Sequence, residues 1–195
     1  MLGLVSMLTW VVPSSAQNTK LKKIYMVTDM EGVDGIFDSE LQCVPWKSPR
    51  WEESRKLLTG EINAAVKGLY DGGATEVVVL DGHDRSRSLS VLDIDPRVKL
   101  LQGQPMSPTA ELDGSYSGVI FIGQHAMAGA EKGVLGHSES SESIQNIWVN
   151  NRPTGEIGII VMLGGTSGFP PSCFPAITPR VESCRNWCRN RNAPK

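Results

Sequence analysis

Three apolar runs in this chain end in polar, glycine-containing segments, and this arrangement limits the folds that the chain can adopt. The runs occupy residues 24–28, 76–80 and 119–122. Short continuous apolar runs are typical of strands that are buried on both faces, as in parallel sheets. Parallel strands have their carboxyl ends at one edge of the sheet, where open α/β sheets bind ligands. The pattern therefore predicts a crevice to which three strand ends contribute.

The rest of the chain favours an α/β fold with a mostly parallel sheet flanked by helices. Apolar residues recur at helical spacing over residues 51–70, and Asp71-Gly72-Gly73 predicts the end of that helix. Shorter strands are expected at 98–101 and 147–149, and a buried helix is expected to begin at Glu156. The predicted order is β-α-β-β-β-β-α, with one core.

Side chains that commonly bind metals follow these strand ends. Asp29 and Glu31 follow the first run, His83 the second and His125 the third. In an extended segment residues i and i+2 point the same way, so Asp29 and Glu31 can present two carboxylates to one face. Each pattern alone is usually a surface acid pair or a loop histidine. Their repetition at three strand ends favours a metal site at the carboxyl ends of the strands.

Two further residues are candidates for chemistry. Glu156 begins an apolar segment, where it could be a metal ligand, a charge stabilised by the helix dipole, or both. His137 lies in the polar loop segment Gly136-His137-Ser138, where it is either a solvated loop residue or an acid/base or hydrogen-bonding group. Mixed histidine and carboxylate ligands suit zinc, and one shared carboxylate would make a two-metal site.

Several segments, taken together and in order, resemble the D-aminopeptidase family of zinc peptidases. The resemblance extends from about residue 22 to about residue 163, with one departure at Ile160, where the family usually has Asn. The segments that carry it are Val27-Thr28-Asp29-Met30-Glu31-Gly32, Leu58-Thr59-Gly60-Glu61-Ile62-Asn63-Ala64-Ala65, Gly73-Ala74-Thr75-Glu76-Val77, Asp81-Gly82-His83, Ile122-Gly123-Gln124-His125-Ala126, Gly136-His137-Ser138 and Gly155-Glu156-Ile157-Gly158.

The resemblance implies a two-zinc aminopeptidase that hydrolyses short peptides with an amino-terminal D-residue or another small residue. It places metal ligands at Asp29, Glu31, His83, His125 and Glu156, with Asp29 bridging, and a catalytic role at His137. It also implies a homo-oligomeric ring. Two alternatives stay open: a non-catalytic remnant that keeps the ligand residues, and, less favoured by the motif order, a metallophosphoesterase.

The two ends of the chain differ from the body that spans residues 22–163. Residues 2–12 are mostly apolar and are followed by small residues, which predicts a signal peptide over residues 1–16 and export to the periplasm or the exterior. No Lys or Arg precedes the apolar stretch, so a cytoplasmic protein is the alternative. Residues 164–195 are rich in Pro, Cys, Arg and Asn and predict an irregular tail, for which a shift of reading frame near Gly164 is one explanation. Such a tail would impair both activity and ring assembly.

Charge and hydropathy exclude two classes of partner. The chain has 19 Lys and Arg against 21 Asp and Glu, so no basic surface for nucleic acid is expected. A membrane span needs about 20 consecutive apolar residues, and no run in the sequence approaches that length.

Overall fold

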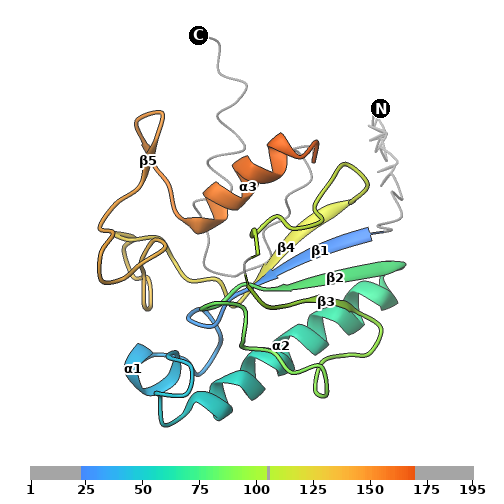
Figure 1. Cartoon of the computed structure of the whole chain (residues 1–195), viewed down its shortest axis with the longest axis horizontal. Coiled ribbons are helices and arrows are strands. Elements are labelled where there is room, and N and C mark those ends of the chain that lie inside the picture. The colour runs from blue at the N-terminus through green and yellow to red at the C-terminus, as the bar shows by residue number, and fades with distance from the viewer. Residues whose placement is uncertain (1–22, 105, 170–195) are drawn as a thin grey trace, which may run out of the picture.

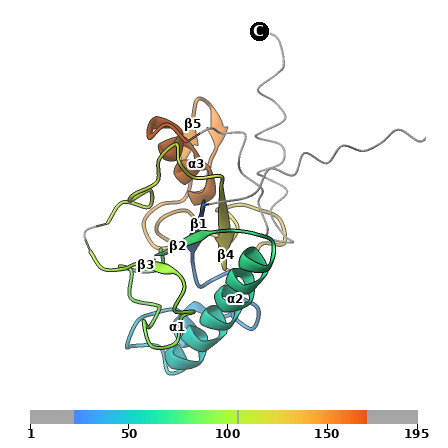
Figure 2. The ribbon, with the colours of Figure 1, turned by 90° about the vertical axis from the view of Figure 1, so that its right-hand side faces the viewer.

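A parallel sheet of four strands with helices on both faces forms the centre of the molecule (Figures 1 and 2). The computed structural model describes residues 23–104 and 106–169. The strand order is β3-β2-β1-β4, and every neighbouring pair is parallel. The predicted α/β class with a mostly parallel sheet flanked by helices is therefore confirmed. The strands are β1 (Lys23–Thr28), β2 (Glu76–Asp81), β3 (Lys99–Leu101) and β4 (Gly118–Ile122).

One face of the sheet is covered by the long helix α2 (Trp51–Asp71). The sequence predicted this helix because its apolar residues recur every three or four positions, and Leu58, Ile62 and Val66 are fully buried. They pack with alternate residues of the strands, such as Met26 and Val79. This cluster is the larger of the two cores.

The opposite face is covered by α3 (Glu156–Thr166), as Figure 1 shows. Ile157, Ile160 and Val161 pack there with the strand residues whose side chains point away from α2, among them Tyr25 and Val27. Successive strand residues point to opposite faces, so a strand that is apolar throughout contributes to both cores. Asp29, two residues after Val27, lines the same cavity as Val27 and Ile160 of α3.

Two small elements differ from the expected order. A short helix, α1 (Ser39–Gln42), is capped by the Asp38 carboxylate, which accepts a hydrogen bond from the Leu41 N–H. The strand expected at 147–149 is β5 (Trp148–Val149), but it pairs antiparallel with β6 (Arg152–Pro153) outside the main sheet. The residues between them, Asn150 and Asn151, both have positive φ, which is typical of a tight hairpin turn.

The last described residues continue the packed structure beyond Leu163. Helix α3 runs on to Thr166, and the Phe169 side chain is only 1% exposed within the core on the α3 side. The rest of the predicted irregular tail, and the predicted signal peptide at 1–16, lie outside the described residues. Within the described ranges, no helix has the length and apolar character that crossing a membrane requires.

Candidate metal centre

Three glycines allow the strand ends at this edge of the sheet to approach one another closely. A Cβ on Gly32 would lie 2.4 Å from the Gln124 carbonyl oxygen, and one on Gly82 would lie 2.4 Å from that of Thr28. On Gly123, which has a φ of +70°, it would lie 2.1 Å from the Asp29 carbonyl oxygen. Real Cβ atoms do not approach so closely. The glycines are therefore required for the contact that brings the polar side chains after β1, β2 and β4 together.

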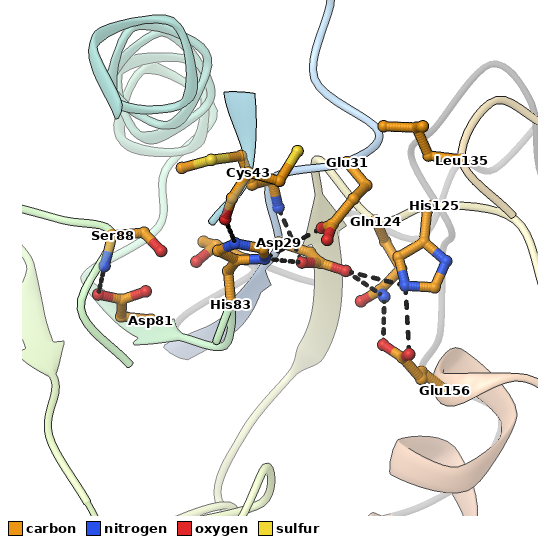
Figure 3. A network of polar contacts seen from close by, with 12 residues as sticks. Asp29, Glu31, Cys43, Asp81, His83, Ser88, Gln124, His125, Leu135 and Glu156 are labelled. Carbon is orange, nitrogen blue, oxygen red and sulfur yellow. Dashed lines mark hydrogen bonds and ion pairs between the residues drawn. The ribbon is translucent and has the colours of Figure 1, made fainter. Parts of the chain in front are cut away.

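The first group of candidate ligands combines the ends of β1 and β2. His83 Nδ1 lies 3.1 Å from Asp29 Oδ1 and 3.0 Å from Glu31 Oε2. All three side chains are nearly inaccessible to solvent, and Figure 3 shows them converging. Their ligand atoms lie within 4.8 Å of one another, which is close enough to hold one ion.

The second group combines the end of β4 with the start of α3. His125 Nε2 lies 3.2 Å from Glu156 Oε1 and 3.4 Å from Asp29 Oδ2. Asp29 thus presents one carboxylate oxygen to each histidine (Figure 3). All five residues that the sequence indicated as metal ligands meet around this carboxylate, although they come from four different elements or their ends.

Each of these histidines has its other ring nitrogen held by a backbone carbonyl. His83 Nε2 lies 2.7 Å from the Cys43 carbonyl oxygen, and His125 Nδ1 lies 2.9 Å from that of Ala126. A ring nitrogen facing a carbonyl carries the proton, so in the neutral imidazole the other nitrogen has its lone pair directed at the carboxylates. Metal-binding histidines are commonly oriented in this way.

The electrostatics of the centre reflect the burial of three carboxylates beside two imidazoles. Burial, together with the charge of Glu31, raises the pKa of Asp29 to about 7. Burial alone would also raise the pKa of Glu31, but the neighbouring His83 imidazole outweighs the effect of burial and lowers that pKa. Burial opposes the charged form of His125, yet Glu156 and Asp29 raise its pKa to about 9. Positive charge is therefore strongly favoured between these carboxylates.

His137 lies directly against the second group. Its ring stacks on that of His125 with centroids 3.7 Å apart and an interplanar angle of 14°. Its Nδ1 lies 2.8 Å from the Leu135 carbonyl oxygen, which leaves Nε2 for other contacts. His125, His137 and Glu156 also place ligand atoms within 4.8 Å of one another. The position allows His137 either to act on a substrate, as the sequence suggested, or to bind a metal.

Two polar residues of this region were not singled out from the sequence. Gln124 is 6% exposed, and its amide donates to Asp29 Oδ2 at 2.7 Å and to Glu156 Oε2 at 2.9 Å. Asp81, at the end of β2, accepts hydrogen bonds from the Ser88 and Leu89 N–H groups and shapes the loop after His83. Gln124 directly precedes His125, and Asp81 lies two residues before His83, so proximity to a predicted ligand in the sequence is the signal that could indicate them.

The donor set fits zinc on the geometry of this structure. Glu31 Oε2 is buried and, among the described residues, has no hydrogen bond of acceptable geometry although it lies near His83 Nδ1. A buried carboxylate oxygen without a donor is costly unless a cation satisfies it. Imidazole nitrogens and carboxylate oxygens are both zinc ligands. A cavity of about 180 Å³ lies beside the group, lined in part by Asp29, Glu139 and Glu156, and gives access to it.

A parallel α/β sheet whose strand ends gather histidines and carboxylates around a shared aspartate defines a protein with a candidate metal centre. Comparison with known proteins identifies the family. The model of the D-aminopeptidase family matches residues 22–173. The chain belongs to the D-aminopeptidase family. It is 33% identical over 150 residues to a D-aminopeptidase of Bacillus subtilis (strain 168).

A solved structure agrees with this assignment. The chain superimposes with a TM-score of 0.70, at 33% sequence identity, on a protein described as the Zn-dependent D-aminopeptidase DppA from Bacillus subtilis, a self-compartmentalizing protease. Each match covers 76% of this chain and 53% of the known protein. The chain therefore spans about half the length of the relatives that it matches.

Proposed function

We propose that this chain carries the metal centre of a zinc-dependent aminopeptidase that acts on short peptides with an amino-terminal D-residue or another small residue. The observation that carries the proposal is the position of Asp29, whose two oxygens face two separate histidine and carboxylate groups. The Zn-dependent relative supports zinc, and the two groups around Asp29 support two ions per chain. Its self-compartmentalizing description supports a homo-oligomer.

Each residue of the centre has a defined part in this proposal. Glu31 and His83 would hold the first ion, His125 and Glu156 would hold the second, and Asp29 would contribute one carboxylate oxygen to each. Zinc ions in such a site supply Lewis acidity to a peptide carbonyl and lower the pKa of water. The residues would hold the ions beside the cavity, and the burial of Asp29 and Glu31 limits their contact with solvent.

His137 is proposed as the group that moves a proton or donates a hydrogen bond to the oxygen on which charge develops. Its Nδ1 is tied to the Leu135 carbonyl oxygen, so the ring is held with Nε2 available. A positioned acid or hydrogen-bond donor of this kind contributes on the order of 10²-fold or more to rate.

The first prediction tests these roles. The wild-type chain should bind two zinc ions, measured by elemental analysis after dialysis, and a chelator should abolish release of D-alanine from a dipeptide. His137→Ala should keep both ions and lose roughly 10²-fold or more in kcat. Loss of zinc from His137→Ala would instead make this residue a ligand.

A second candidate function is a non-catalytic protein that keeps the metal-ligand residues. The ligand groups lie within the part of the relatives that the chain matches, about half of their length, and metal binding requires these groups alone. This non-catalytic reading predicts two bound zinc ions without hydrolysis of any D-alanyl peptide. The zinc content and the activity, measured on the same sample, separate the two functions.

A further inference from the structure

Gln124 links the two carboxylates that face His125. Its Nε2 donates one hydrogen bond to Asp29 Oδ2 at 2.7 Å and another to Glu156 Oε2 at 2.9 Å (Figure 3). The primary amide has two N–H donors, so one group can serve both oxygens. The side chain is buried, and solvent does not replace these contacts easily.

The hydrogen bonds from Gln124 orient the carboxylates of Asp29 and Glu156. Glu156 is held at both oxygens, because Gln124 donates to Oε2 while the Glu139 N–H donates to Oε1 at 2.7 Å. The same Oε1 lies 3.2 Å from His125 Nε2. Gln124 therefore fixes the separation of Asp29 from Glu156 on the side where His125 offers its nitrogen.

The His83 side of the centre is held by other groups. Asp29 Oδ1 accepts the Met30 N–H at 2.8 Å, and His83 Nε2 is 2.7 Å from the Cys43 carbonyl oxygen. The contacts of Gln124 reach the opposite oxygen of Asp29. The His83 side and the His125 side of the centre are thus held by different hydrogen bonds.

We propose that Gln124 is a positioning residue that sets the zinc affinity of the His125 side without affecting that of the His83 side. The inference rests on the proposed two-zinc centre. An amide suits the task because it brings two like-charged carboxylates together while adding no positive charge that would compete with a cation. Hydrogen-bond partners of metal ligands typically change metal affinity 10- to 100-fold when they are removed.

The test measures zinc affinity on each side separately, by competition with a chromophoric chelator. His83→Ala leaves the His125 side as the intact site, and His125→Ala leaves the His83 side. Gln124→Met is introduced into both, because Met has a similar volume and no N–H donor. Gln102→Met is the matched control, since the Gln102 amide also donates to a strand-end carboxylate, Asp81 Oδ2, at 2.9 Å, outside both groups.

In the His83→Ala protein, Gln124→Met is expected to weaken zinc binding 10- to 100-fold. In the His125→Ala protein it should change the affinity less than about threefold, which also shows that the variant folds. Gln102→Met should have no effect on either side. Equal losses on both sides, no loss on the His125 side, or the same loss with Gln102→Met would overturn the role of Gln124. If the unmodified chain binds fewer than two zinc ions, the proposed two-zinc centre fails and this inference with it.

Discussion

At the scale of single residues, the charges of the candidate centre depend on pH in a predictable direction when no metal is bound. The pKa of His125 is raised to about 9 because Glu156 and Asp29 outweigh the effect of burial. In the unfolded chain this imidazole titrates near 6.5. A group whose pKa is higher in the folded chain than in the unfolded chain stabilises the fold fully at a pH below its pKa in the unfolded chain. This stabilisation is lost as the pH rises through its pKa in the folded chain. Burial and Glu31 raise the pKa of Asp29 to about 7, so the contribution of Asp29 to stability also falls as the pH rises.

The second prediction follows from the raised pKa values of His125 and Asp29. In the presence of a chelator, the free energy of unfolding should fall between pH 6.5 and 9, by on the order of 1–3 kcal/mol. Urea unfolding at several pH values measures this change. His125→Gln cannot be protonated in this range and should give a flatter dependence. A free energy that rises over the same interval would show that the histidine is not charged in the folded, metal-free protein.

The sequence indicates the candidate ligands but not Gln124, which donates hydrogen bonds to two of them, Asp29 and Glu156. Asp29, Glu31, His83 and His125 were recognisable because each follows a predicted strand. The sequence does not indicate Gln124, because an amide is not a usual zinc ligand and its hydrogen-bond partners lie 95 and 32 residues away in the chain. Such a contact depends on the register of β1 against β4 and on the place of α3, which local patterns do not specify.

At the scale of elements, the approach of β1 to β4 depends on backbone contacts that a side chain would block. The Asp29 N–H donates to the Ile122 carbonyl oxygen at 2.9 Å, and the Gly32 N–H donates to that of Gly123 at 2.7 Å. These bonds continue the pairing past the end of the strands. Gly123 lies at the closest point, with positive φ.

The third prediction compares two glycines. Gly123→Ala should destabilise the protein by more than about 2 kcal/mol, because the new Cβ clashes with backbone and an unfavourable φ is imposed. Gly60→Ala is the control: it lies inside α2, nothing would lie within 4 Å of its Cβ, and alanine is the better helix former. It should stabilise by roughly 0.5–1 kcal/mol. Thermal unfolding monitored by circular dichroism measures both, and equal effects of the two substitutions would contradict the close-contact argument.

Most elements were predictable because their signals are local. The spacing over residues 51–70 indicated α2 to within one residue, and the apolar runs indicated β1, β2 and β4. The sequence did not reveal that β5 pairs with β6 apart from the main sheet. Both strands have two residues, and pairs this short are decided by the turn at Asn150 and Asn151 rather than by a hydrophobic pattern.

At the scale of the whole molecule, the candidate centre connects the sheet with α3, which packs on the sheet through apolar side chains. Asp29, His83 and His125 follow strands of the sheet, whereas Glu156 begins the helix that covers its α3 face. An ion bound between them would fasten α3 to the carboxyl edge of the sheet. Global stability should therefore depend on zinc.

The fourth prediction concerns this dependence. Zinc at 100 times its dissociation constant should raise the free energy of unfolding by about 2.7 kcal/mol for one site, because it binds the folded chain and not the unfolded one. The midpoint of thermal unfolding should rise on adding zinc and return on adding a chelator. Glu156→Gln should reduce this rise, since it weakens the ligand that α3 contributes. Glu139→Gln is the control, because the Glu139 backbone N–H, which donates to Glu156, is retained in this variant. A rise that Glu156→Gln leaves intact would mean that zinc stabilises the chain without joining α3 to the sheet.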